Sequence, residues 1–202
     1  MIVNARQFVV ALVATLLFSL SAYAQQARAD NAEALIASLG DRALKVLVVD
    51  SQSDEQRIEA FRGLLNEGFD LPLIGRYALG RYWRQATAGQ KDEYGKLFED
   101  FIVRTYAARL GQYSGETLKV DGSRADDGDT IVSSEIVRPD KPGIRVDWRV
   151  RNSSEGPKIV DVVVEGVSML LTQRDEFASV IQRAGGNVEG LLVRLREKAP
   201  AN

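Results

Sequence analysis

The sequence predicts a single α+β domain in which helices pack against one side of a curved antiparallel sheet of about four to five strands. Residues 31–110 and 169–198 place apolar side chains at helical intervals, whereas residues 117–164 contain short strand-like runs. Turn-rich segments separate these runs, which favours antiparallel neighbours. Residues 158–171 carry apolar side chains on both faces, so both sides of the sheet need an apolar cover there, supplied by the protein's helices or by a ligand.

The amino terminus has the pattern of a secretory signal peptide, predicted over residues 1–24. Arg6 supplies the positive charge, residues 8–20 the apolar segment and residues 22–24 the small-residue cleavage site. A membrane anchor is the less favoured alternative, because the apolar run is shorter than the roughly 20 residues that cross a bilayer. The sequence therefore predicts an exported protein.

Two helices are predicted next. The first has Asp30 or Asn31 as its cap and an apolar stripe that ends near Val49. The second follows Ser53 and stops at Gly68, since glycine is common just after a helix.

A short third helix is predicted between the cap Asp70 and Gly80. The fourth begins with a capping box at residues 87–90, in which a threonine precedes a glutamine by three positions. Its apolar stripe is rich in aromatic residues, and it is predicted to end near residues 111–115.

Four strands follow, predicted over residues 117–120, 130–137, 144–151 and 158–164. The third alternates strictly between apolar and charged side chains, so its charged face is expected to be exposed to solvent.

Helical periodicity returns after residues 169–171 and is interrupted at Gly185 and Gly186, which predicts two closing helices. Residues 25–198 are thus predicted to form one domain without a repeat or linker. Residues 199–202 are predicted to be a disordered tail.

Composition excludes several classes of function. The chain has 26 basic and 28 acidic residues, which is not the basic excess of a nucleic-acid-binding protein. It has no histidine, which removes Ser-His-Asp and Cys-His catalysis and histidine-ligated zinc. It has no cysteine, so the core alone must stabilise the fold. After the leader, charged residues recur too often for a membrane span.

Three carboxylates in the strands, Asp147, Asp161 and Glu165, are candidates for acid and base roles of the kind used in glycoside hydrolysis. The favoured interpretation is structural, because a strand aspartate commonly pairs with an arginine on its neighbour. Residues 126–129 resemble part of a calcium loop but lack its bidentate acid, so a solvated turn is expected.

Aromatic side chains are concentrated between residues 77 and 106, where a helical stripe more often forms ordinary core than a binding site. Arg76, Arg81 and Arg84 lie among them. Such cations at the mouth of an apolar pocket could meet a phosphate, and a solvated helix face explains them almost as well.

Three segments resemble the MlaC (toluene-tolerance) family. They are LGRYWR at residues 79–84, the helix that ends with Thr105 and Tyr106, and DVVVEGVS at residues 161–168. Their order extends over nearly the whole chain after the leader, and together they are much more specific than any one of them.

The resemblance implies a periplasmic phospholipid carrier of Gram-negative bacteria, with an α+β fold whose deep apolar cavity takes up acyl chains. It implies no enzymatic activity, no cofactor and no metal. It further implies that a monomer shuttles lipid between an outer-membrane lipoprotein complex and an inner-membrane ABC transporter, which maintains outer-membrane lipid asymmetry.

The residues expected to line this cavity are the inward apolar side chains of the helices and of one sheet face, which could be either face: Leu73, Tyr77, Phe98, Phe101, Ile102, Tyr106, Val146, Trp148, Val162, Val164 and Met169. Residues that match the family pattern are given a headgroup or structural role: Arg81, Trp83, Arg84, Asp161 and Glu165. A buried ion pair between Asp161 and an arginine is expected to brace the sheet.

Overall fold

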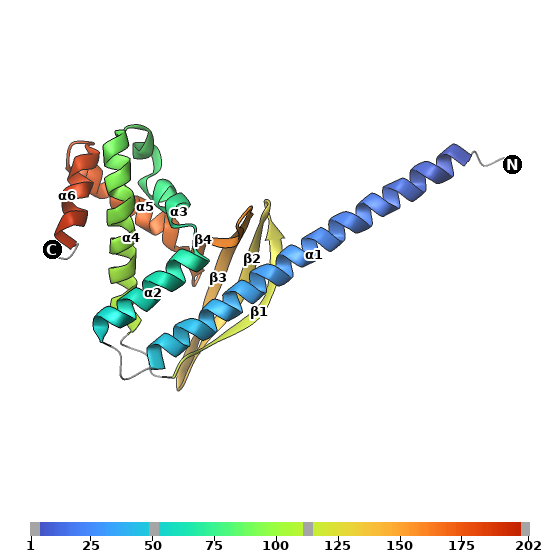
Figure 1. Ribbon diagram of the computed structural model, residues 1–202, viewed down its shortest axis with the longest axis horizontal. Helices are drawn as coiled ribbons and strands as arrows, with labels where there is room; N and C mark the ends of the chain where they lie inside the picture. Colours follow the sequence, from blue (N-terminus) through green and yellow to red (C-terminus); the bar gives the residue numbers. More distant parts are fainter. Residues whose placement is uncertain (1–4, 49–52, 111–114, 199–202) are drawn as a thin grey trace.

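The computed structural model describes residues 5–48, 53–110 and 115–198 (Figure 1). The predicted helix end at Val49 and the predicted tail at residues 199–202 lie outside the described residues. In chain order the elements are α1 (Ala5–Val48), α2 (Asp54–Gly68), α3 (Leu71–Leu79), the 3-10 helix η1 (Gly80–Arg84), α4 (Ala88–Leu110), β1 (Thr117–Asp126), β2 (Asp129–Arg138), β3 (Lys141–Ser153), β4 (Gly156–Val164), β5 (Val167–Ser168), α5 (Met169–Arg183) and α6 (Val188–Lys198).

The sheet is a five-stranded antiparallel meander with the order β1-β2-β3-β4-β5. The predicted α+β class, the antiparallel sheet and the helices on either side of it in the sequence are confirmed. The short edge strand β5 lies where no separate strand was predicted. Register shifts interrupt the ladder between Val120 and Gly122 and between Arg149 and Val150, and such bulges increase the twist of a sheet.

One face of the sheet is apolar and packs on α1. Val132, Trp148 and Val162 lie opposite one another on neighbouring strands, and the core on this face includes Ala32 and Ile36 of α1. The charged side chains of β3 alternate onto the other face, as expected from the period of two.

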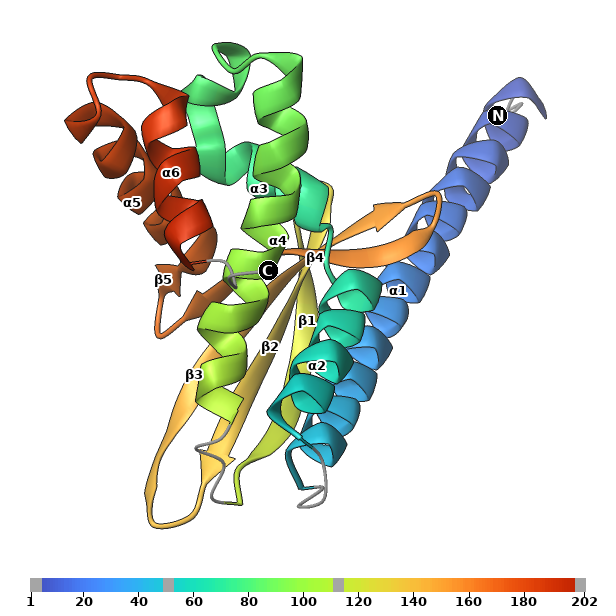
Figure 2. The same cartoon turned by 60° about the vertical axis from the view of Figure 1, so that its left-hand side comes forward.

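The remaining helices form a second layer. Helix α2 lies between α1 and α4, while α4 packs on α6 and α3 packs on α5 (Figure 2). Their shared core contains apolar side chains from α3, η1, α4, α5 and α6, including Leu79, Tyr82, Tyr94, Phe177 and Leu192. Figure 2 shows α4 crossing in front of the sheet.

Side-chain caps explain where several helices begin. Ser53 and Gln56 form a reciprocal capping box at α2, and Asp70 accepts from the backbone N–H of Leu73 at 3.0 Å. The predicted capping box of α4 is present, since Thr87 and Gln90 each accept a hydrogen bond from the other's backbone N–H. These local signals therefore set the helix starts as predicted.

Helix α1 is longer than predicted, because it begins at Ala5 and continues without a break past Asp30 and Asn31. The predicted cap there is wrong. The chain has no glycine or proline between Ala5 and Leu39 and is rich in alanine, so nothing in this stretch ends a helix. The predicted signal peptide and its cleavage site lie within or before this helix and stay a prediction.

Candidate functional site

Four of the predicted acyl-chain residues share the apolar face of the sheet. Val146 lies opposite Val164, and Trp148 lies opposite Val162. Since side chains alternate along a strand, these four side chains point to the same side, which is the side that α1 covers. The sequence did not determine which face they share, and the structure does.

Their burial differs. Val146 is only 2% exposed, whereas Trp148, Val162 and Val164 are half-buried. Trp148 and Val162 also touch the core shared with α1. The apolar surface that remains accessible on this face therefore belongs to the positions on either side of Val146 rather than to Val146 itself.

A serine that the sequence analysis missed links two residues of this face by hydrogen bonds. Ser134 is 1% exposed; its hydroxyl donates to the carbonyl oxygen of Val146 at 3.1 Å and accepts from Trp148 Nε1 at 2.8 Å. These bonds satisfy the indole N–H and fix the orientation of the ring. The polar side-chain atoms of Ser134 and Trp148 are thus already paired, which suits contact with an apolar ligand. No sequence signal separates Ser134 from other strand serines.

The helical candidates divide into two groups. Leu73, Ile102, Tyr106 and Met169 are half-buried, and Ile102 touches two of the helical cores. Met169 is the first residue of α5, directly after the edge strand. These side chains keep accessible apolar surface, as the three half-buried sheet residues do.

Phe98 and Phe101, by contrast, lie inside the closed helical core. Their rings stand 6.2 and 5.7 Å from that of Phe177, and Phe98 stacks on Tyr94 at 5.6 Å. The Tyr94 hydroxyl donates to the carbonyl oxygen of Gly75 at 2.9 Å, and burial raises the pKa of this phenol well above its usual value. These aromatic rings therefore make a filled core.

Tyr77 is not inward, which corrects the prediction. It is 50% exposed, because the buried stripe of α3 consists of Leu71, Gly75, Ala78 and Leu79, and Tyr77 lies beside that stripe. Its hydroxyl interacts with Arg151 of β3.

The residues of the LGRYWR segment have separate roles. Trp83 is half-buried and meets Tyr94 edge-on at 6.4 Å. Arg81 donates to the Tyr82 hydroxyl at 2.9 Å and lies over that ring. Arg84 is exposed on η1. The two arginines therefore lie on the surface of the helical layer.

Asp161 binds the start of α5 instead of an arginine. Its carboxylate accepts from the Ser168 hydroxyl at 2.6 Å and from the backbone N–H of Leu170 at 3.1 Å. The predicted Asp161–arginine pair is therefore wrong: within the described residues, Arg149 and Arg151 pair with Asp126 and Asp129. The backbone N–H groups of Val162 and Leu170 and the Ser168 hydroxyl thus satisfy Asp161 without a cation.

Glu165 closes the neighbouring hairpin. Val164 pairs with Val167, so Glu165 and Gly166 form a two-residue turn, with φ angles of 50° and 81°. The Glu165 carboxylate accepts from the backbone N–H of Arg145 at 2.6 Å, and its own N–H donates to the Arg145 carbonyl oxygen at 3.0 Å. The conspicuous EG pair is therefore a turn signal.

The three candidate carboxylates make separate structural hydrogen bonds. Asp147 accepts from the Ser133 hydroxyl at 2.7 Å, while Asp161 and Glu165 are held by the bonds above. The predicted solvated turn at residues 126–129 is a tight hairpin with Asp127 and Gly128 at positive φ. In the part of the chain that the structure describes, no three metal-ligating side chains converge, and no helix is long and apolar enough to span a bilayer.

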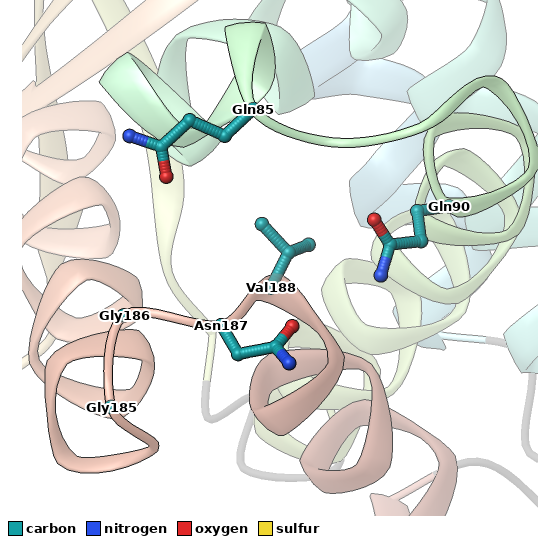
Figure 3. A pocket seen from close by; sticks show the side chains of 6 residues that line it. All are labelled: Gln85, Gln90, Gly185, Gly186, Asn187 and Val188. Atoms are coloured by element: carbon teal, nitrogen blue, oxygen red, sulfur yellow. The ribbon is translucent and has the colours of Figure 1, made fainter.

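Two surface pockets lie away from these residues. One, of about 320 Å³, is lined by Gln85, Gln90 and residues 185–188; Figure 3 shows Val188 lying between the two glutamines. The other, of about 390 Å³, lies between the α2–α3 junction and the β3–β4 turn. None of the predicted acyl-chain residues lines either pocket.

A family model described as MlaC protein matches residues 37–197. The chain belongs to the MlaC family. One curated relative is the intermembrane phospholipid transport system binding protein MlaC from Haemophilus influenzae, which is 23% identical over 64% of this chain and 62% of that protein. Another is toluene tolerance protein ttg2D from Pseudomonas putida, which is 26% identical over 54% of this chain and 51% of that protein. The matches thus span less than two thirds of either relative.

A solved structure is also similar. It is the phospholipid-binding protein from Ralstonia solanacearum in complex with a phospholipid. The similarity has a TM-score of 0.71 and 28% sequence identity, and covers 83% of this chain and 96% of that one. The fold described above is therefore similar to the fold of this phospholipid-binding protein.

Proposed function

We propose that this MlaC-family protein is a phospholipid carrier of the periplasm that holds acyl chains between its helical layer and the apolar face of its sheet. The observation that carries the proposal is the similarity to a protein solved with a bound phospholipid, which extends over 96% of that chain. Membership of the MlaC family and a relative described as a phospholipid transport binding protein support it.

The accessible apolar side chains are the proposed lipid contacts: Leu73, Ile102, Tyr106, Trp148, Val162, Val164 and Met169. Phe98 and Phe101 form the closed core behind them. Since Val146 is only 2% exposed, an acyl chain reaches it only after neighbouring side chains move aside.

The physical basis of carriage is the cost of exposing hydrocarbon to water. Each buried CH₂ contributes about 0.8 kcal/mol, so a phospholipid with long acyl chains almost never leaves a membrane unaided. An apolar site offsets this cost during passage through water. A headgroup left in solvent needs few contacts, and the selectivity of the site then depends on chain volume more than on headgroup chemistry.

We further propose that the protein acts as an exported monomer, without a cofactor, and exchanges lipid with an outer-membrane lipoprotein complex and an inner-membrane ABC transporter. The relative's description as an intermembrane transport component supports these partners. A carrier at equilibrium only exchanges lipid, so the direction of transport must come from its partners and from ATP use by the transporter. Such transport would maintain outer-membrane lipid asymmetry.

The test is native mass spectrometry of protein purified without detergent. A carrier is expected to retain phospholipid, and empty protein that takes up none from liposomes would contradict the proposal. A hopanoid or a solvent-like molecule in the same extract would support the second candidate, a carrier of another apolar ligand. A hydrolase is disfavoured because Asp161 and Glu165 are held by structural hydrogen bonds; Asp161→Asn and Glu165→Gln would abolish turnover in a hydrolase only.

A further inference from the structure

The surface of α3 and η1 carries arginines without carboxylate partners. Residues 71–90 contain Arg76, Arg81 and Arg84 and no aspartate or glutamate. All three are exposed, and none of them forms an ion pair with a described residue. Seven other arginines of the described chain form ion pairs: Arg42, Arg57, Arg62, Arg149, Arg151, Arg194 and Arg196. Arginines elsewhere, such as Arg124 and Arg183, also lack an ion pair, but no other stretch of 20 described residues outside α1 carries three of them without an acid.

Helix α5 adds a fourth cation to this surface. Helices α3 and α5 pack side by side, and the Arg174 side chain lies against Gly80, the residue before Arg81. Arg174 is exposed and has no carboxylate partner in the described part of the chain. Asp175 and Glu176 follow it on α5, and Glu176 accepts a hydrogen bond from Gln173. Residues 71–84 and 169–176 thus carry four exposed arginines and two exposed acids.

Apolar side chains are exposed on the same two helices. Tyr77 of α3 is 50% exposed and Leu171 of α5 is 54% exposed, among the largest exposures of apolar side chains in the described chain. Each is close in sequence to a cation of this surface, Tyr77 beside Arg76 and Leu171 one helical turn before Arg174. We call these six residues the α3–α5 surface: Arg76, Tyr77, Arg81, Arg84, Leu171 and Arg174.

We propose that the α3–α5 surface docks on an anionic phospholipid membrane. Guanidinium groups form bidentate hydrogen bonds with phosphates, and exposed aromatic and aliphatic side chains between them enter the headgroup boundary. Charge complementarity favours this occupant because none of the four arginines has a carboxylate partner in the described chain; Arg81 is held only by the hydroxyl and ring of Tyr82. An acidic protein offers the charge but has no need of the exposed Tyr77 and Leu171.

This inference goes beyond the proposed acyl-chain site, because none of these six residues is among the proposed lipid contacts. Docking would hold the carrier at a membrane while lipid moves in or out. The two ideas are therefore tested separately: retained lipid reports on the site, and vesicle binding reports on the surface.

The experiment is co-sedimentation of the purified protein with vesicles of phosphatidylglycerol and phosphatidylethanolamine, compared with vesicles of phosphatidylcholine alone. The test variant carries Arg76→Gln, Arg84→Gln and Arg174→Gln. The matched control carries Lys96→Gln, Arg124→Gln and Lys141→Gln, which remove the same charge from exposed cations on α4, β1 and β3 that have no ion pair within the described chain. Native mass spectrometry measures retained lipid in all three proteins.

We expect the wild type to bind the anionic vesicles more strongly, with an affinity that falls as salt rises. Each cation near an anionic surface raises the binding constant roughly fivefold. The test variant is therefore expected to bind the anionic vesicles at least about tenfold more weakly than the wild type. The control variant is expected to bind them nearly as well as the wild type. Leu171→Ser is expected to weaken binding at high salt. If both triple variants lost the same affinity for anionic vesicles, binding would depend on net charge alone, and the proposal would be overturned. Absence of wild-type binding would also overturn it and leave an acidic protein as the occupant.

Discussion

The Asp161 carboxylate accepts a hydrogen bond of 2.6 Å from the Ser168 hydroxyl, and the same hydroxyl oxygen accepts from the backbone N–H of Leu171 at 3.1 Å. Asp161 itself accepts from the N–H of Leu170. The two side chains together satisfy two of the free donors at the start of α5. They join β4, β5 and α5 into one unit.

Removing either side chain should therefore destabilise the protein by different amounts. Ser168→Ala loses one cap and is expected to cost about 1 kcal/mol of unfolding free energy. Asp161→Ala loses several charge-assisted bonds and is expected to cost about 2 to 3 kcal/mol. Urea unfolding measures both, with Asp92→Ala, an exposed aspartate, as the control. Additive costs in the double variant would contradict the coupling.

The turn at Glu165 and Gly166 gives a prediction about glycine. Gly166→Ala places a side chain at φ 81° and is expected to destabilise by about 1 kcal/mol or more. Gly95→Ala is the matched control, because Gly95 lies inside α4 with open space where a Cβ would stand, and it is expected to stabilise by up to about 1 kcal/mol. Equal changes in melting temperature for both variants would contradict this assignment.

Larger side chains on the apolar face should show whether a position contacts lipid or belongs to the packed core. Val164 is half-buried, so Val164→Trp is expected to reduce the phospholipid retained per protein with little loss of stability. Val146 is buried, so Val146→Trp is expected to reduce retained lipid and also to lower the free energy of unfolding by about 1 to 3 kcal/mol. Val137→Trp, at an exposed position of β2, is the control. Full retention of lipid in Val164→Trp would remove this residue from the proposed site.

The Asp129 carboxylate predicts an acid-dependent loss of stability. Its side chain is 4% exposed and bonds Arg151 at 2.7 and 2.8 Å and Arg149 at 3.2 Å. The hydrogen bonds from Arg151, more than those from Arg149, lower the pKa of Asp129 below its ordinary value. A lowered pKa contributes stability that is fully present above the unfolded-state value of about 3.9 and is lost as the pH falls through the folded-state value.

Unfolding measured between pH 7 and pH 3 checks this sign. The wild type is expected to lose stability below about pH 4. Asp129→Asn is expected to be less stable at pH 7 by about 1 to 3 kcal/mol and to depend less on pH in that acid range. Asp92→Asn should leave the profile unchanged, and a wild-type profile that is flat down to pH 3 would contradict the argument.

Local signals predicted the elements well where one short segment decides the outcome. The capping box of Thr87 and Gln90 and the strict alternation of β3 depend on neighbours within a few residues, and both are present in the structure. The start of α1 was mispredicted because Asp30 can cap a helix only where the chain turns, and an alanine-rich segment gives it no reason to turn.

The sequence by itself determined the α+β class, the meander of strands, the absence of histidine and cysteine chemistry and the resemblance to the MlaC family. Only the tertiary structure decided which sheet face meets α1, that Ser134 orients Trp148, that Tyr77 points outward and that Asp161 binds α5 rather than an arginine. The reason is physical: periodicity tells which side chains share a face, while the partner that satisfies a buried face or a carboxylate depends on how the chain folds back in space, as where Ser168 and Leu170 reach Asp161.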